Sequence, residues 1–161
     1  MNRTPEKNRK IVLGLGNALN RDEGLGVHCL EPLRERLKDF PAIDILDGGV
    51  LGLDLLPLVE SCSHLVILDA VDARKPPGTV IELRRDEIPL FSRVKLSCHQ
   101  VTFQEVLQLA GVRGNLTNHL HLVGAQPADT STGFGLSPII VPLVPEIVDR
   151  AVAVLKKWRL V

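Results

Sequence analysis

Apolar runs that end in glycine-rich or acidic turns alternate along the chain with segments whose apolar residues recur every three or four positions. Continuous or alternating apolar residues are typical of strands buried in a sheet, and four runs predict such strands: residues 10–15, 42–46, 65–71 and 119–125. A recurrence of three or four is typical of one helix face, and it predicts four helices: residues 27–40, 53–59, 102–110 and 146–158.

A proline-rich turn changes this alternation after the third strand. Pro76, Pro77 and Gly78 lead directly into an apolar run at residues 79–83. Because this connection is too short for a crossover helix, residues 79–83 are predicted to run antiparallel at an edge of the sheet. The pattern predicts a single domain over residues 1–161, an α/β fold of the open three-layer α/β/α sandwich type. Its sheet is expected to be mostly parallel, with about five strands and one antiparallel edge strand.

Prolines also mark the ends of two predicted helices. Pro41 ends the first, because the residue before a proline is disfavoured in helical conformation. Ser137 followed by Pro138 is typical of an N-cap and first helical turn, which favours an earlier start for the last helix. Pro142 and Pro145 leave that boundary open.

Composition excludes some partners. The chain carries 19 basic and 19 acidic residues, no Tyr, one Trp and four Phe, so it has neither a basic excess nor a stacking platform for nucleic acid. The first apolar run is too short for a signal peptide or a membrane span. Three cysteines without a CxxC pair favour reduced thiols and a cytoplasmic protein without a membrane partner.

Polar residues at the expected carboxyl ends of strands are the candidates for chemistry, because ligands of open α/β sheets bind there. Asp69 interrupts an apolar run, and a buried carboxylate needs a cation or donors. Glu23 follows the first strand and His99 precedes a helix, so Glu23, Asp69 and His99 could offer a divalent metal two carboxylates and an imidazole. Alternatively, Asp69 caps a turn, while Asp22 and Glu23 form the acidic first turn of a helix.

Six blocks of the sequence, in order, resemble the hydrogenase maturation protease family: residues 14–27, 47–53, 69–79, 97–100, 124–127 and 136–138. The resemblance implies an aspartic-type endopeptidase that removes the C-terminal extension from the large-subunit precursor of a nickel–iron hydrogenase. It also implies that Glu23, Asp69 and His99 bind metal, that nickel arrives with the substrate, and that the protein is a monomer. The catalytic candidates are Asp69, Glu23 and Asp47, with Asp47 a general base or a residue that orients the metal ligands.

Three other functions compete with this interpretation. A dinucleotide-binding enzyme would explain Gly14 and Gly16, but Leu19 stands where the fingerprint needs its third glycine. A non-catalytic metal-binding chaperone would use the same three ligands. A cysteine protease using Cys98 and His99 is disfavoured, because adjacent residues of an extended segment point to opposite sides.

Two further histidines, His119 and His121, alternate on one strand face without an evident third metal ligand.

Overall fold

The computed structural model describes residues 6–90 and 98–161, apart from the side chains of residues 98–102. Within that part of the chain, a five-stranded sheet has the order β2-β1-β3-β5-β4. The strands are β1 (Arg9–Leu15), β2 (Ile43–Gly49), β3 (Cys62–Ala70), β4 (Val80–Arg84) and β5 (His119–Ala125). All neighbouring pairs are parallel except β4 with β5, so the predicted antiparallel edge strand is confirmed.

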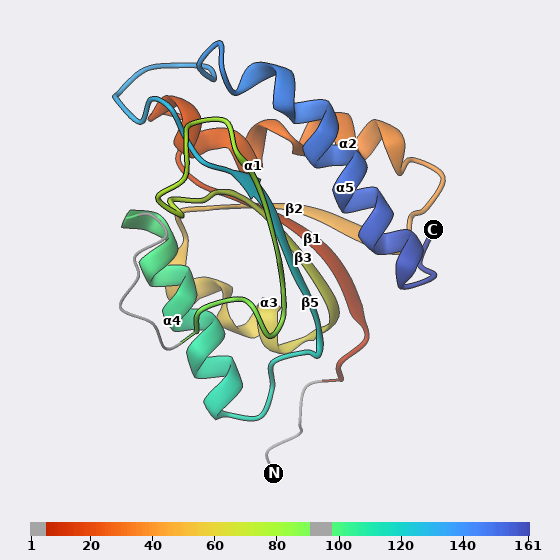
Figure 1. Cartoon of the computed structure of the whole chain (residues 1–161). Coiled ribbons are helices and arrows are strands. Elements are labelled where there is room, and N and C mark those ends of the chain that lie inside the picture. Colours follow the sequence, from red (N-terminus) through yellow and green to blue (C-terminus); the bar gives the residue numbers. More distant parts are fainter. Residues whose placement is uncertain (1–5, 91–97) are drawn as a thin grey trace.

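Helices cover both faces of the sheet, which confirms the three-layer prediction (Figure 1). One face carries α1 (Leu25–His28), α2 (Leu30–Arg36) and α5 (Val144–Lys157), and the other carries α3 (Leu56–Glu60) and α4 (Cys98–Val112). Three short 3-10 helices complete the order: η1 (Arg21–Gly24), η2 (Gly52–Leu55) and η3 (Val141–Leu143). Each face has its own apolar core, as expected when alternate strand residues point to opposite sides.

The first predicted helix is shorter than expected and divided. Instead of one helix over residues 27–40, α1 and α2 meet at Cys29 and end at Arg36. Pro32 explains the break, because it has no N–H to donate to the carbonyl four residues earlier and is tolerated only in a first helical turn. Phe40 lies beyond the helix and stays partly exposed.

The last two helices also differ from the prediction at their starts. Helix α4 begins at Cys98, four residues earlier than expected, so His99 lies within the helix instead of before it. Helix α5 begins at Val144, after a turn in which the amides of Ile140 and Val141 donate to the Ser137 carbonyl. Ser137 therefore begins a turn and not the regular helix.

The order of the strands creates a switch point beside β1. The chain passes from β1 to β2 on one side and then to β3 on the other, so the loops that follow β1 and β3 diverge. In open α/β sheets such a divergence leaves a crevice at the carboxyl ends of the strands, where ligands bind. Glu23 and Asp69 come from these two neighbouring strand ends.

Candidate functional site at the carboxyl edge of the sheet

Glu23 is held in the short helix η1, in the loop that connects β1 to α1. Its side chain is half-buried, and the Asn20 amide nitrogen donates a hydrogen bond to Oε2 at 3.0 Å. The carboxylate lines a pocket of about 300 Å³ whose other walls are Ala70, Asp72 and the segment that follows β5. Glu23 is therefore oriented toward a space that can receive a ligand.

Asp69 lies one residue before the end of β3 and is 3% exposed. Because alternate strand residues share a face, it lies on the same face as Ile67, in the core that α3 and α4 cover. There it lines a small cavity with Leu15, Gly49 and Phe103, and Phe103 belongs to α4. The prediction of a buried carboxylate within an apolar strand is confirmed.

Gly16 allows the two carboxylate-bearing segments to approach each other. A Cβ at this position would lie 1.7 Å from the Glu23 carbonyl oxygen and 3.6 Å from Asp69 Oδ1. The residue also has φ +116, which favours glycine. Only glycine therefore lets the Glu23 backbone pack directly over the end of β1, beside Asp69.

The pair does not form a complete metal centre by itself. Glu23 and Asp69 line two different hollows, one on each side of this contact. Among the side chains that the structure describes, no group of three or more His, Cys, Asp or Glu residues could hold a metal ion. Two carboxylates supply hard oxygen ligands, and a third ligand has to come from elsewhere.

His99 was predicted as that third ligand. Its backbone lies in the first turn of α4, and its side chain lies outside the described residues. The same holds for Cys98, so the geometry of a Cys98–His99 pair is also outside the description. The metal-binding role of His99 stays a prediction.

Asp47 lies apart from the other two acids. It pairs with Gly14 of β1, whose partner on the other side is Leu68 of β3, so two strand spacings, about 10 Å, separate Asp47 from the end of β3. Strand alternation places it with Ile45 on the face of α1 and α2. Asp47 is exposed, and Oδ1 accepts a 2.8 Å hydrogen bond from the Gly49 amide.

Asp22 is a structural acid that the sequence did not identify. It is completely buried, and its Oδ2 accepts hydrogen bonds from the amides of Ala128 and Asp129 at 2.9 and 2.8 Å. The Ser137 amide donates to Oδ1 at 2.7 Å, and the Ser137 hydroxyl donates to Oδ2 at 2.8 Å. Asp22 thus fixes the loop before α5 against the loop that carries Glu23, and the interpretation as an acidic helix turn misses this role.

Gln126 closes the site on the side of β3. It is 8% exposed, and Oε1 accepts hydrogen bonds from the amides of Ala73 and Lys75 at 2.8 and 3.2 Å. Its amide nitrogen donates to Asp72 Oδ1 at 3.2 Å. Gln126 therefore holds the loop after β3 beside Glu23's pocket, and its place within the resembling block at residues 124–127 was the available signal.

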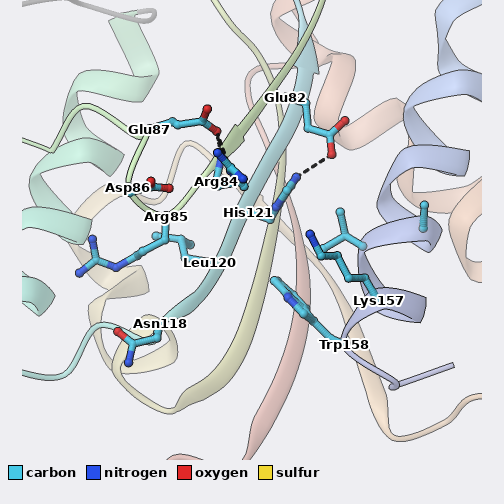
Figure 2. A pocket seen from close by; sticks show the side chains of 12 residues that line it. Glu82, Arg84, Arg85, Asp86, Glu87, Asn118, Leu120, His121, Lys157 and Trp158 are labelled. Atoms are coloured by element: carbon cyan, nitrogen blue, oxygen red, sulfur yellow. Dashed lines mark hydrogen bonds and ion pairs between the residues drawn. The ribbon is translucent and has the colours of Figure 1, made fainter.

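A cavity of about 590 Å³ lies away from these acids, between the β4–β5 edge and the end of α5 (Figure 2). His121 and Glu82 form a 2.7 Å contact there, and Glu82 also accepts from Arg150 at 2.9 Å. Burial opposes ionisation of Glu82, but hydrogen bonds from His121 and Arg150 outweigh it and lower its pKa. His121 thus takes part in a hydrogen-bond network with Glu82 and Arg150.

His119 packs against two other rings. Its ring stacks on His64 with centroids 4.2 Å apart, and Trp158 lies at the edge of His119 at 5.6 Å.

Two cysteines behave as buried apolar side chains. Burial raises the pKa of the Cys29 thiol to about 12. Burial also raises the pKa of Cys62 to about 12, although Arg9 acts in the opposite direction. At neutral pH both are protonated, which removes them as nucleophiles.

No helix in the described part of the chain is long and apolar enough to cross a membrane.

Comparisons with known proteins give one consistent family. The model of the HycI family, described as hydrogenase maturation protease, matches residues 27–154. The chain is 39% identical over 155 residues to the hydrogenase expression/formation protein HupD of Bradyrhizobium diazoefficiens, covering 95% of this chain and 81% of that protein. It is 36% identical over 152 residues to the hydrogenase 2 maturation protease of Escherichia coli, covering 92% of each.

Solved structures agree with the sequence relatives. The hydrogenase maturating endopeptidase HybD from E. coli superposes with a TM-score of 0.83 at 33% identity, covering 92% of this chain and 93% of that one. The nickel–iron hydrogenase maturation protease HybD from Thermococcus kodakarensis gives 0.72 at 25% identity, covering 90% and 97%. The family model's match spans the strand ends that carry Asp47 and Asp69. The chain belongs to the hydrogenase maturation protease family.

Proposed function

We propose that this protein is an endopeptidase that removes the C-terminal extension from the nickel-loaded large-subunit precursor of a nickel–iron hydrogenase. Membership of the family supports the reaction class and the type of substrate. The observation that carries the site assignment is that the Glu23 backbone and the Asp69 carboxylate both lie against Gly16 at the switch point of the sheet. Carboxylates in such a position can bind a cation or activate water.

In this proposal the substrate brings the metal, and Glu23, Asp69 and His99 supply ligands to it. Asp69 is nine-tenths buried or more, so a cation beside it relieves the cost of holding a carboxylate out of water. Helix α4 packs on the same face as Asp69 through Phe103, which is why His99 in the first turn of that helix remains the third candidate.

Hydrolysis then needs a water oxygen to attack the scissile carbonyl carbon, a base to take the water proton, and a donor to protonate the leaving amine. A carboxylate of this site acts as the base, which is the sense in which the enzyme is an aspartic-type peptidase. Asp47 is the candidate for this step that does not also bind the metal.

The direct test follows the mass of a matched pair of precursors, one loaded with nickel and one without it. The nickel-loaded precursor is expected to lose its C-terminal peptide, and Glu23→Gln, Asp69→Asn and His99→Ala are each expected to abolish the loss. Cleavage of both precursors at equal rates would refute recognition of the metal. Binding without shortening would instead identify a non-catalytic metal-binding chaperone.

Asp47→Asn separates catalysis from binding. Asp47 lies about two strand spacings from the end of β3, too far from Asp69 to bind the same metal ion. The Asp47→Asn variant is therefore expected to lower kcat by about 100-fold while its affinity for the precursor stays unchanged. Single-turnover processing with a parallel binding measurement checks both quantities. A variant that processes at the wild-type rate would show that Asp47 only stabilises its turn through Gly49.

A further inference from the structure

Exposed apolar side chains gather at the carboxyl edge of the sheet. The described residues leave ten large apolar side chains exposed, and seven of them lie on the segments that follow β1, β2 and β5. We call five of these the carboxyl-edge rim: Leu19, Val50, Leu51, Leu53 and Phe134. The other two, Ile139 and Val141, lie farther along the chain, at or just before η3. The Phe134 side chain, at 83% exposed, lies between two glycines and covers no core.

The loops that carry the rim are joined to one another. The Gly16 amide donates to the Gly49 carbonyl, which links the loop after β1 to the loop after β2. The Gly133 amide donates to the Leu19 carbonyl, and the Arg21 amide donates to the Gly133 carbonyl. Figure 1 shows the light-blue loop between β5 and α5 beside the red-orange segment before α1. The loops that carry the rim are therefore held together by backbone hydrogen bonds.

The rim has an energetic reason to be covered. Burying one Leu or Phe side chain contributes roughly 1.5–3 kcal/mol, and a contiguous exposed apolar surface commonly marks an interaction site. Residues 16–24, which include Leu19, also carry Glu23, and Val50 lines the same cavity as Asp69. The rim therefore borders the segments that carry both carboxylates.

We propose that the carboxyl-edge rim docks an apolar surface on the folded body of the hydrogenase large-subunit precursor, beside the bond to be cut. This inference rests on the proposed function and adds the surface that recognises the substrate protein. Three exposed acids lie at the same edge of the sheet: Asp47 near the end of β2, Asp54 in η2 and Asp72 after β3. Their charge complements a partner that carries a metal cation. A second copy of this chain on the rim would instead cover Glu23 and block the site.

The test compares Leu19→Ser/Phe134→Ser with Val112→Ser, an apolar-to-Ser change at a 73% exposed residue in the last turn of α4, away from the rim. Affinity for nickel-loaded precursor is measured on a sensor surface, and kcat and KM are measured by mass spectrometry. The double variant is expected to lose about tenfold or more in affinity, with the loss in KM and not in kcat. Val112→Ser is expected to match the wild type in both.

Three results would overturn the inference: wild-type affinity of the double variant, equal loss in Val112→Ser, or a rim-dependent dimer in sedimentation with unchanged precursor affinity. Equal melting temperatures establish that the variants are folded. If wild-type protein binds the precursor without cutting it, the proposed function fails, and the affinity comparison still decides whether the rim docks it.

Discussion

At the scale of single residues, a buried acid could be predicted from the sequence where its neighbours are all apolar. Asp69 stands in an apolar strand, and a charge in such a run has a physical cost that the sequence alone reveals. Glu23 was weaker by pattern, because an acid beside a helix start is common, and only the fold places it over Gly16. A side chain at Gly16 would overlap the Glu23 carbonyl, and the positions of residues along the sequence do not reveal this contact.

Gly16→Ala is expected to separate Glu23 from Asp69. A methyl group there would overlap the Glu23 carbonyl, so η1 must move, and processing is expected to fall about 100-fold or more because small displacements of catalytic groups are costly. Stability should also fall by roughly 1–3 kcal/mol, from the positive φ and the overlap.

The matched control for this change is Gly114→Ala. Gly114 also has positive φ, +72, but a Cβ there meets nothing within 4 Å. Urea midpoints and the processing rate are measured for both variants. Equal processing losses would show that backbone strain, and not the approach of Glu23, causes the defect.

At the scale of elements, the predicted strands are confirmed because long apolar runs leave little doubt about burial. The helices were predicted in type but not in extent. Pro32 divides the first, and its effect was overlooked because the apolar spacing continues through it to Leu37. The pairing of strands across the sheet could not be predicted from the apolar pattern either. This pairing places His64 of β3 opposite His119 of β5.

This pairing predicts a loss of stability below pH 6.5. Burial lowers the pKa of His64 from its ordinary 6.5, and the neighbouring His119 and Lys10 add to the shift. The folded state therefore favours neutral His64, while the unfolded chain takes up a proton as pH falls through 6.5. The stability that neutral His64 contributes is complete above 6.5 and is lost as pH falls toward the lower folded pKa.

His64→Gln is expected to flatten the free energy of unfolding between pH 6.5 and 5. Glu82 does not affect the slope in this pH range. Its pKa is lowered in the folded state, so the stability that its charged form contributes is lost only below pH 4.5. His28→Gln, at an exposed residue of α1, serves as the control and should leave the slope unchanged. An identical slope in His64→Gln and the wild type would contradict this origin.

At the scale of the whole molecule, the site depends on contacts between distant parts of the chain. The Asp22 carboxylate receives its described hydrogen bonds from residues more than 100 positions away. No local pattern distinguishes such an acid from a surface helix turn, which is why the sequence predicted the ligands but not the residue that fixes their frame. The family resemblance indicated both loops without indicating that they are joined.

Asp22→Asn should show how much of the frame this one carboxylate holds. An asparagine offers one acceptor oxygen in place of two and directs its own N–H groups at the amides of Ala128, Asp129 or Ser137. Leaving buried donors without acceptors costs roughly 1–3 kcal/mol each, so unfolding should become easier by about 3 kcal/mol or more. Asp129→Asn removes an equally charged but partly exposed acid, whose partners are Ser131 nearby in the sequence and Arg21 in η1, and it should cost much less stability than Asp22→Asn. Chemical denaturation of both variants gives the comparison.

Because the same bonds hold the wall opposite Glu23, the folded fraction of Asp22→Asn should also process precursor more slowly. Wild-type turnover by that fraction would show that the Asp22 hydrogen bonds stabilise the fold without positioning the site.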